Sequence, residues 1–322
     1  MRRLTAILTA TAVAASLAAC AVPHRRDDGS AIDKPAATRA QVTAVYERYR
    51  EVRNAAAELL DPKPLSTVET GPVLAIDTGA FEVSQKLDQA GQEDSGPIDV
   101  TQVETPRFRA YPLWMFAVVR DTERKVNRLQ VFERATSVDP WLLVATPEAL
   151  TSTVLPDLRH DGSGHAVTVK PDDGRGMALS AQEAADGYAK TLADPDADVA
   201  GPITDDAFVR QMREVAQANS SLDGVQFEQS WAAEKVRYVL RTADGGALAF
   251  ITLLRSDRYT VDQDRKVTWP DGSPQQALLE DGIQAGSGTL NYYHQILVSL
   301  PGGSAKPRAL AQYGGVVQGQ VG

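Results

Sequence analysis

The histidines are the first candidates for chemistry, because metal sites and proton-transfer sites usually depend on this side chain. The sequence has four, of which His24 lies near the N-terminus while His160 and His165 flank a glycine-rich stretch. A site built from His160, Asp161 and His165 would lack rigid geometry in such a loop and would have no fourth ligand nearby. We therefore expect an exposed connection there, and we predict no bound metal and no cofactor.

The remaining histidine, His294, falls in an apolar stretch at 290–300 where residues alternate as in a strand. On the concave face of a curved sheet it could exchange protons with a carboxylate such as Glu228. A lone histidine in an apolar strand is more often a packed core residue, and we favour that interpretation. The residues that we assign to a possible pocket are Trp114, Trp231, Tyr292 and His294.

Other signatures of catalysis or ligand binding are missing from the sequence. The stretch Gly162-Ser163-Gly164 lacks the strand, turn and helix of a nucleophile elbow, and there is no phosphate loop or dinucleotide fingerprint. The acidic run at 194–198 lacks the glycine and glutamate of a calcium loop, and Asp205-Asp206 suits a helix N-terminus. A net charge of −9 without a dense basic cluster argues against nucleic acid as a partner. The sequence favours a protein that is not an enzyme.

The N-terminus has the form of an export signal. Two arginines follow Met1, and the run from Leu4 to Leu17 contains no charged residue. This run is too short for a permanent membrane helix, which needs roughly 20 apolar residues. The only cysteine of the chain, Cys20, follows directly, and a lone cysteine in an exported chain cannot form an internal disulfide.

The motif Leu17-Ala18-Ala19-Cys20 resembles the lipobox of bacterial lipoproteins, which is cleaved before its cysteine. The resemblance implies a signal peptide over 1–19 and an acylated Cys20, with palmitate-type chains that bind the external face of the cell membrane. The alternative is an ordinary secretory signal followed by a chance cysteine. Residues 20–37 are polar and aperiodic, and we expect them to form a flexible tether.

The first half of the remaining chain predicts helices followed by strands. Thr38 and Gln41 have the spacing of a capping box ahead of a long amphipathic helix, which Pro62 ends. A second helix should be short or broken, because Gly71-Pro72 interrupts it. The strand-like runs that follow are 98–103, 113–119, 128–134 and 141–145. We expect residues 38–158 to form one α+β domain.

The second half repeats this order after a linker at 159–178 that is rich in glycine and proline. Ser180 and Glu183 form another capping box, and a further helix is expected from Thr204. The strand-like runs here are 225–231, 236–240, 247–254 and 290–300, with Asp244-Gly245-Gly246 as a hairpin turn. We expect a second domain over 179–312 and a disordered tail over 313–322.

The fold class expected from these patterns is α+β, with two tandem domains in which N-terminal helices pack on a curved antiparallel sheet. This arrangement is similar to the cone-shaped nuclear-transport-factor-two-like (NTF2-like) fold. The chain also resembles actinobacterial lipoproteins of unassigned function, most clearly at Thr67-Val68-Glu69-Thr70-Gly71-Pro72. This second resemblance implies no catalytic residues.

The function expected from the sequence is that of a membrane-tethered extracytoplasmic lipoprotein. It would bind an envelope protein or a small molecule, without catalysis, in the groove between domains or on a concave sheet face. The alternative is a cone-fold small-molecule-binding protein or enzyme that uses a pocket around His294.

Overall fold

The computed structural model describes residues 33–91, 99–194, 201–279 and 282–322. The signal peptide 1–19, the lipidation site Cys20, His24 and most of the expected tether lie outside the described residues. Contacts divide the chain into the units Met1–Asp33 and Lys34–Gly322, and the described helices and strands all lie in the second unit. We refer to its described residues up to 158 as the first half and to those from 179 as the second half.

The folded unit begins before the helix that was expected to open it. Strand β1 (Lys34–Pro35) pairs with β3 (Arg107–Phe108), and the next two residues, Ala36 and Ala37, are buried. The end of the expected tether 20–37 is therefore part of the fold. The sequence did not indicate this, because alanine is too small to mark a core position.

The first helix, α1 (Arg39–Leu59), begins at the predicted capping box, in which Thr38 accepts from Gln41 and the Gln41 side chain accepts from Thr38. A short 3-10 helix, η1 (Lys63–Thr67), follows. The prediction of a short or broken second helix was wrong, because α2 runs over Gly71–Lys86. Its proline lies in the first turn, where no backbone donor is needed, so the pair starts the helix instead of interrupting it.

The described strands form one large antiparallel sheet in which β2-β4-β5-β7-β14-β13-β10-β8 are neighbours, while β6 pairs with β5 and β9 with β10. Its members are β2 (Asp99–Glu104), β4 (Leu113–Asp121), β5 (Val126–Arg134), β6 (Leu142–Ala145), β7 (Glu148–Leu150), β8 (Val225–Ala233), β9 (Tyr238–Arg241), β10 (Ala247–Val261), β13 (Ser287–Leu300) and β14 (Arg308–Val321). A separate small pair joins β11 (Lys266–Val267) to β12 (Ile283–Gln284).

In the second half, α3 (Ala181–Ala193) starts at the predicted capping box of Ser180 and Glu183. The next helix, α4 (Ala207–Ser220), starts three residues later than Thr204, because the Asp206 side chain accepts from the backbone of Val209. A short helix, α5 (Pro274–Leu279), lies near the C-terminal strand. The predicted hairpin turn joins β9 to β10, with Asp244 accepting from the backbone of Gly246.

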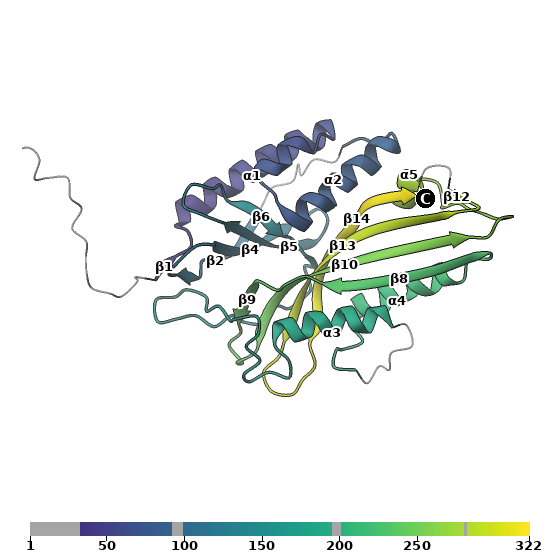
Figure 1. Ribbon diagram of the computed structural model, residues 1–322. Helices are drawn as coiled ribbons and strands as arrows, with labels where there is room; N and C mark the ends of the chain where they lie inside the picture. Colours follow the sequence, from purple (N-terminus) through teal and green to yellow (C-terminus); the bar gives the residue numbers. More distant parts are fainter. Residues whose placement is uncertain (1–32, 92–98, 195–200, 280–281) are drawn as a thin grey trace, which may run out of the picture. The chain divides into compact units, whose positions relative to one another are not determined.

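The elements pack in layers, as Figure 1 shows, with α1 and α2 on one side and α3 and α4 on the other. Helix α1 packs on the face of β4 and β5 that carries Met115 and Phe132. The opposite face of β4, with Trp114 and Phe116, packs against Tyr238, Leu240, Leu248, Phe250 and Leu297 of the second half. Helices α3 and α4 cover the far face of β10 and β13. The two halves therefore share a core.

The prediction of a disordered tail over 313–322 was wrong, since most of these residues belong to β14. This strand lies between β7 of the first half and β13 of the second. Glycines suggested a frayed end, but they permit close packing. A Cβ at Gly314 would lie 2.7 Å from the ring of His294, and a Cβ at Gly79 of α2 would lie 2.3 Å from the carbonyl oxygen of Val316.

The coarse prediction of an α+β protein with a large antiparallel sheet is confirmed, whereas the arrangement as two tandem NTF2-like domains is not confirmed. Strands from 38–158 and from 179–312 join one sheet through β14, and the linker 159–178 is itself bonded to the second half. Each half still shows the predicted order of helices before strands.

Candidate functional site

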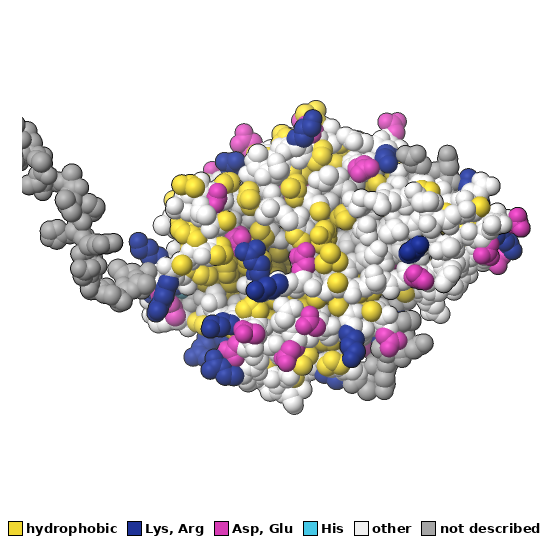
Figure 2. All heavy atoms as spheres, viewed as in Figure 1, with side chains coloured by type: hydrophobic (Ala, Val, Ile, Leu, Met, Phe, Trp, Pro, Cys, Tyr) yellow, Lys and Arg dark blue, Asp and Glu magenta, His cyan; other side chains and the backbone are white. Residues whose placement is uncertain are grey.

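A cavity of about 470 Å³ lies where the two halves meet. Its first-half wall comes from the start of α2 and from the ends of β5 and β6, and its second-half wall comes from β9, β10 and β13. Figure 2 shows a hollow near the middle of this view, with hydrophobic side chains around it and both Lys/Arg and Asp/Glu at its rim. The cavity thus has the mixed lining that small-ligand sites commonly have.

A carboxylate of the first half binds two residues of the second at the edge of the cavity. Glu133 of β5 accepts a hydrogen bond of 2.8 Å from the Tyr238 hydroxyl and one of 2.6 Å from the guanidinium of Arg237. The guanidinium carbon also lies 5.3 Å from the centre of the Tyr238 ring. Burial and the negative charge of Glu133 raise the pKa of Tyr238 well above its usual value, so the phenol stays neutral and donates.

The floor of the cavity is fixed by a buried amide. The side chain of Gln295 on β13 accepts from the backbone N–H of Thr146 at 3.1 Å and donates to the carbonyl of Val144 at 2.8 Å. These two bonds hold β13 against the first half, next to Thr252 of β10, which lies directly opposite in the sheet. Gln295 therefore positions the floor and also presents polar atoms near the cavity.

The rim carries opposite charges that are close in sequence. Glu234 is half-buried, and burial raises its pKa above the usual value. Lys235 and Arg237 are exposed beside it, and Asp139 contributes from the first half. A ligand that enters the cavity therefore meets both carboxylates and cations before it reaches apolar side chains.

The wall formed by Thr70, Gly71 and Pro72 follows directly on a buried acidic group. Glu69 has no exposed surface, and its backbone lies beside Leu143 of β6. Burial, and then the negative charge of Asp77, raise the pKa of Glu69 well above its usual value, which favours the protonated form at neutral pH.

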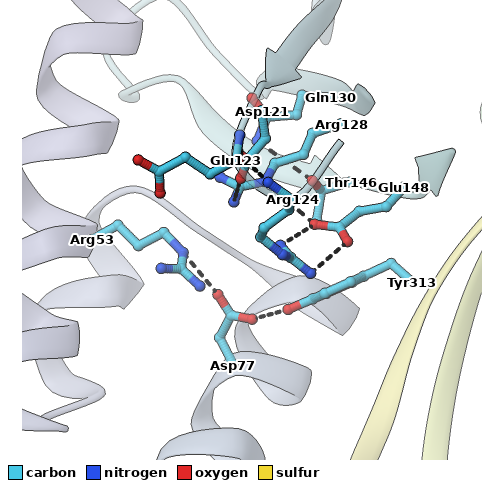
Figure 3. Close-up of polar contacts among 10 residues, drawn as sticks. All are labelled: Arg53, Asp77, Asp121, Glu123, Arg124, Arg128, Gln130, Thr146, Glu148 and Tyr313. Carbon is cyan, nitrogen blue, oxygen red and sulfur yellow. Dashed lines mark hydrogen bonds and ion pairs between the residues drawn. The ribbon is translucent and has the colours of Figure 1, made fainter. Parts of the chain in front are cut away.

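Figure 3 shows how neighbouring charges tie the helices to the sheet. Asp77 of α2 lies 3.5 Å from Arg53 of α1 and accepts a hydrogen bond from the Tyr313 hydroxyl of β14. Nearby, Arg128 contacts Glu148 and Asp121 at 3.3 and 3.0 Å. The Asp77 contacts therefore tie α1 and α2 to β14, while the Arg128 contacts join β4, β5 and β7 to one another.

His294 lies outside the cavity, on the face of β13 that α4 covers. Its ring packs at 5.2 Å from the Trp231 ring, 5.9 Å from Phe208 and 6.1 Å from Tyr292. Burial, assisted by the positive charge of Arg255, lowers the pKa of His294 to about 3, so the ring is neutral at physiological pH. It is a packed core histidine, as the sequence favoured.

The carboxylate partner that catalysis by His294 would need is not found. Glu228 is exposed, while its strand neighbours Phe227 and Gln229 are half-buried. No hydrogen bond joins His294 to a carboxylate in the part of the chain that the structure describes, and its Nε2 atom is buried without a partner there. Among the described residues, 159–165 included, no group of three or more His, Cys, Asp or Glu side chains is placed so that it could hold a metal ion.

Trp231 and Tyr292 surround a buried ion pair that the sequence did not reveal. The guanidinium carbon of Arg255 lies 4.2 Å from the centre of the Tyr292 ring and 5.9 Å from that of Trp231. The Arg255 Nε atom donates to Asp257 at 2.9 Å. Trp114, the fourth predicted pocket residue, is buried in the shared core, 5.7 Å from the Tyr238 ring.

The cavity has no direct signature in the sequence, because its walls come from stretches that are far apart in the chain and its charged residues resemble ordinary surface positions. The one available signal is the alternation in 234–238, where exposed Lys235 and Arg237 alternate with buried Val236 and Tyr238. Such alternation indicates a strand with one polar face, but it does not identify Glu133 as the partner.

The fold and the site define an α+β protein with a large antiparallel sheet and a polar-rimmed cavity between its two halves. The chain belongs to the family described as "Domain of unknown function (DUF8094)", whose profile matches residues 33–320. In the described residues, no helix is both long and apolar enough to span a membrane.

Similar proteins are found in Streptomyces. One from Streptomyces avermitilis, named an uncharacterized lipoprotein, is 28% identical over 85% of this chain and 84% of its own length. Two from Streptomyces coelicolor are also named uncharacterized lipoproteins. One is 28% identical over 66% of this chain and 63% of its own length, and the other is 24% identical over 83% of this chain and 80% of its own length. The comparison with solved structures found no match.

Proposed function

We propose that this protein is a membrane-tethered extracytoplasmic lipoprotein that binds an envelope protein or a small molecule in the cavity between its two halves. The anchor would be an acylated Cys20, in keeping with the names of the relatives and with Leu17-Ala18-Ala19-Cys20. The observation that carries the binding role is a cavity whose two walls come from different halves and are joined by Glu133.

The lining of the cavity supports binding without catalysis. The described residues that line it include no histidine, cysteine or serine, three of the side chains most often used in catalysis. The carboxylate of Glu133 is already engaged by Arg237 and Tyr238. The alternative site around His294 has less support, because that ring is packed beneath α4.

The anchor is tested by Cys20→Ser in the full chain, expressed in an actinobacterial host. We expect the variant to leave the membrane fraction for the soluble or secreted fraction, because it cannot be acylated. Ser30→Ala, in the same expected tether, is the control and should stay with the membrane. Equal membrane retention of Cys20→Ser and the control would contradict the lipid anchor.

The cavity is tested by placing a photo-crosslinking amino acid at Thr252 of the full chain and irradiating intact cells. Thr252 lies on the cavity floor, whereas the control position Val154 is 81% exposed on the first half. We expect a discrete adduct, of a protein or of a small molecule, at Thr252 and not at Val154. Adducts at neither position, or the same products at both, would refute a ligand in the cavity.

A further inference from the structure

One face of the long strands is left without helices along most of its length. Helices α3 and α4 cover the face of β10 and β13 that carries Ile251, Leu253 and Ile296. The opposite face holds a groove of about 830 Å³ beside α2. The side chains on the floor of this groove are Ser230, Ala232, Leu254, Ser256, Asn291 and Tyr293.

The groove begins one row of residues beyond the cavity on the same sheet face. In the cavity, Thr252 of β10 lies opposite Gln295 of β13. The next rows on the same face are Leu254 with Tyr293, and then Ser256 with Asn291. Since two residues span about 6.8 Å of an antiparallel strand, the three rows cover about 14 Å. The cavity and the groove are therefore neighbours on one sheet face, and α2 contributes to the lining of both.

The residues of α2 and those at the far end of the groove agree with a site that runs along the strands. Pro72 of α2 lines the cavity, and Ala75 and Thr78 of the same helix line the groove. One row beyond Ser256, Arg258 lies opposite Glu228, and both are exposed. The groove thus runs from the charged rim of the cavity to a single pair of opposite charges.

Between these two ends the floor carries no charged side chain. Arg255 contributes to the groove, but its guanidinium pairs with the buried Asp257 and contacts Met212 of α4 on the other face. Charged residues make up 23% of the chain, and an open sheet face usually carries several of them. In Figure 2 the surface to the right of the hollow is mostly white, which marks neutral polar side chains and backbone.

The chemistry of the floor selects the ligand. Hydroxyl and amide groups both donate and accept hydrogen bonds, and the half-buried ring of Tyr293 offers an apolar surface between them. A polyanion would need cations along the floor. An added peptide strand would need unpaired backbone, but β10 and β13 are paired on both sides. Sugars present hydroxyl groups together with apolar ring faces, which matches this arrangement.

We propose that the groove binds a linear, uncharged oligosaccharide whose end enters the cavity. This inference rests on the proposed function for its cavity end, and it names the class of ligand. Tyr293 is the central contact, because it lies in the middle row, opposite Leu254 and between Gln295 and Asn291 of its own strand. The ligand would lie along the strands and contact side chains only.

The test uses the purified full chain with Cys20→Ser and an array of linear neutral hexose oligosaccharides of increasing length. Uronic acid oligosaccharides and extended peptides are the comparison ligands. We expect binding of neutral oligosaccharides that strengthens with length and then levels off. Tyr293→Ala should weaken it at least tenfold, whereas Tyr111→Ala, at a tyrosine 42% exposed elsewhere, should leave it unchanged. Thermal unfolding of each variant establishes that it is folded.

Several results would overturn the inference: no binding to any neutral oligosaccharide, preference for the anionic or peptide ligands, or neutral binding that Tyr293→Ala does not weaken. Ser256→Glu provides a second variant, which should weaken neutral binding by placing a charge on the floor. If the Thr252 adduct forms in cells but no oligosaccharide binds, only the ligand class is wrong. If no adduct forms at Thr252, the proposed function itself fails.

Discussion

The two faces of β10 and β13 differ in what covers them and in where their reactive side chains lie. The covered face holds His294, Arg255 and Asp257, which are 9%, 5% and 0% exposed beneath α4. The open face holds Thr252, Ser256 and Tyr293, which are half-buried and neutral. On these two strands the histidine and the ion pair are therefore buried, whereas these accessible side chains are neutral. This contrast can be tested with variants that pair a residue on one face with a control residue on the other face or at an exposed position.

The largest effect is expected at the buried ion pair. Asp257→Asn leaves the Arg255 guanidinium buried without its negative partner, so we expect the free energy of unfolding to fall by about 3–5 kcal/mol. Ser256→Ala, one residue away on the open face, should change it by less than about 0.5 kcal/mol. Urea unfolding measures both. Equal effects of the two substitutions would show that the two faces are not buried differently.

The next effect is the pH dependence that His294 contributes. Its pKa is about 3 in the folded protein, and the unfolded value is close to the ordinary 6.5. Between these values the unfolded chain binds more protons, so the contribution to stability is complete above pH 6.5 and is lost as the pH falls toward 3. The slope approaches about 1.4 kcal/mol per pH unit.

The measurement compares urea unfolding of wild type and His294→Asn from pH 7 to pH 4. Only the pH dependence is informative, because the substitution also alters packing. His160→Asn serves as the comparison, at a histidine whose side chain is 40% exposed and whose Nε2 atom lies 3.0 Å from a carboxylate oxygen of Glu104. A His294→Asn protein that loses stability with acid as steeply as wild type would contradict a buried neutral histidine.

A smaller effect is expected where the halves meet at the cavity rim. Glu133→Gln keeps an acceptor for Tyr238 but removes the charge that faces Arg237, which is half exposed. We expect a loss of about 1 kcal/mol in the free energy of unfolding, measured by urea unfolding. The exposed Glu123→Gln should have almost no effect. A similar loss in this control would show that Glu133 contributes no more to stability than an ordinary surface carboxylate.

A comparably small effect on stability is expected on the open face itself. Tyr293→Ala removes a half-buried ring that faces the groove, so its cost should stay near 1 kcal/mol, while Tyr259→Ala on the covered face should cost about 3–5 kcal/mol. Thermal or urea unfolding distinguishes them. A large loss for Tyr293→Ala would mean that this ring supports the core.

The part of the fold that depends on near neighbours could be predicted from the sequence. The capping boxes at Thr38 and Ser180 and the turn at Asp244 are each decided within four or five residues. Gly71-Pro72 was misread because such a pair can start a helix as well as interrupt one. The C-terminal glycines were misread because they allow close packing, as Gly314 does against His294, and this depends on a partner that the local sequence does not identify.

The candidate site could not be predicted for a related reason. Its floor and walls come from residues between Thr70 and Ile296, and the contact between Glu133 and Arg237 spans 104 positions. Alternation assigned His294 and Tyr293 to opposite faces of one strand, yet it could not say which face the helices would cover. That choice decides whether a histidine or a tyrosine is available to a ligand.

The most direct test compares crosslinking at two open-face positions of β10 with crosslinking at two exposed positions of the first half. The crosslinker is placed in turn at Thr252, Ser256, Leu150 and Val154 of the full chain, and adducts formed in intact cells are identified by mass. The account predicts the same adduct at Thr252 and Ser256, and its absence at Leu150 and Val154. No adduct at the two open-face positions, or the same adduct at all four, would contradict it.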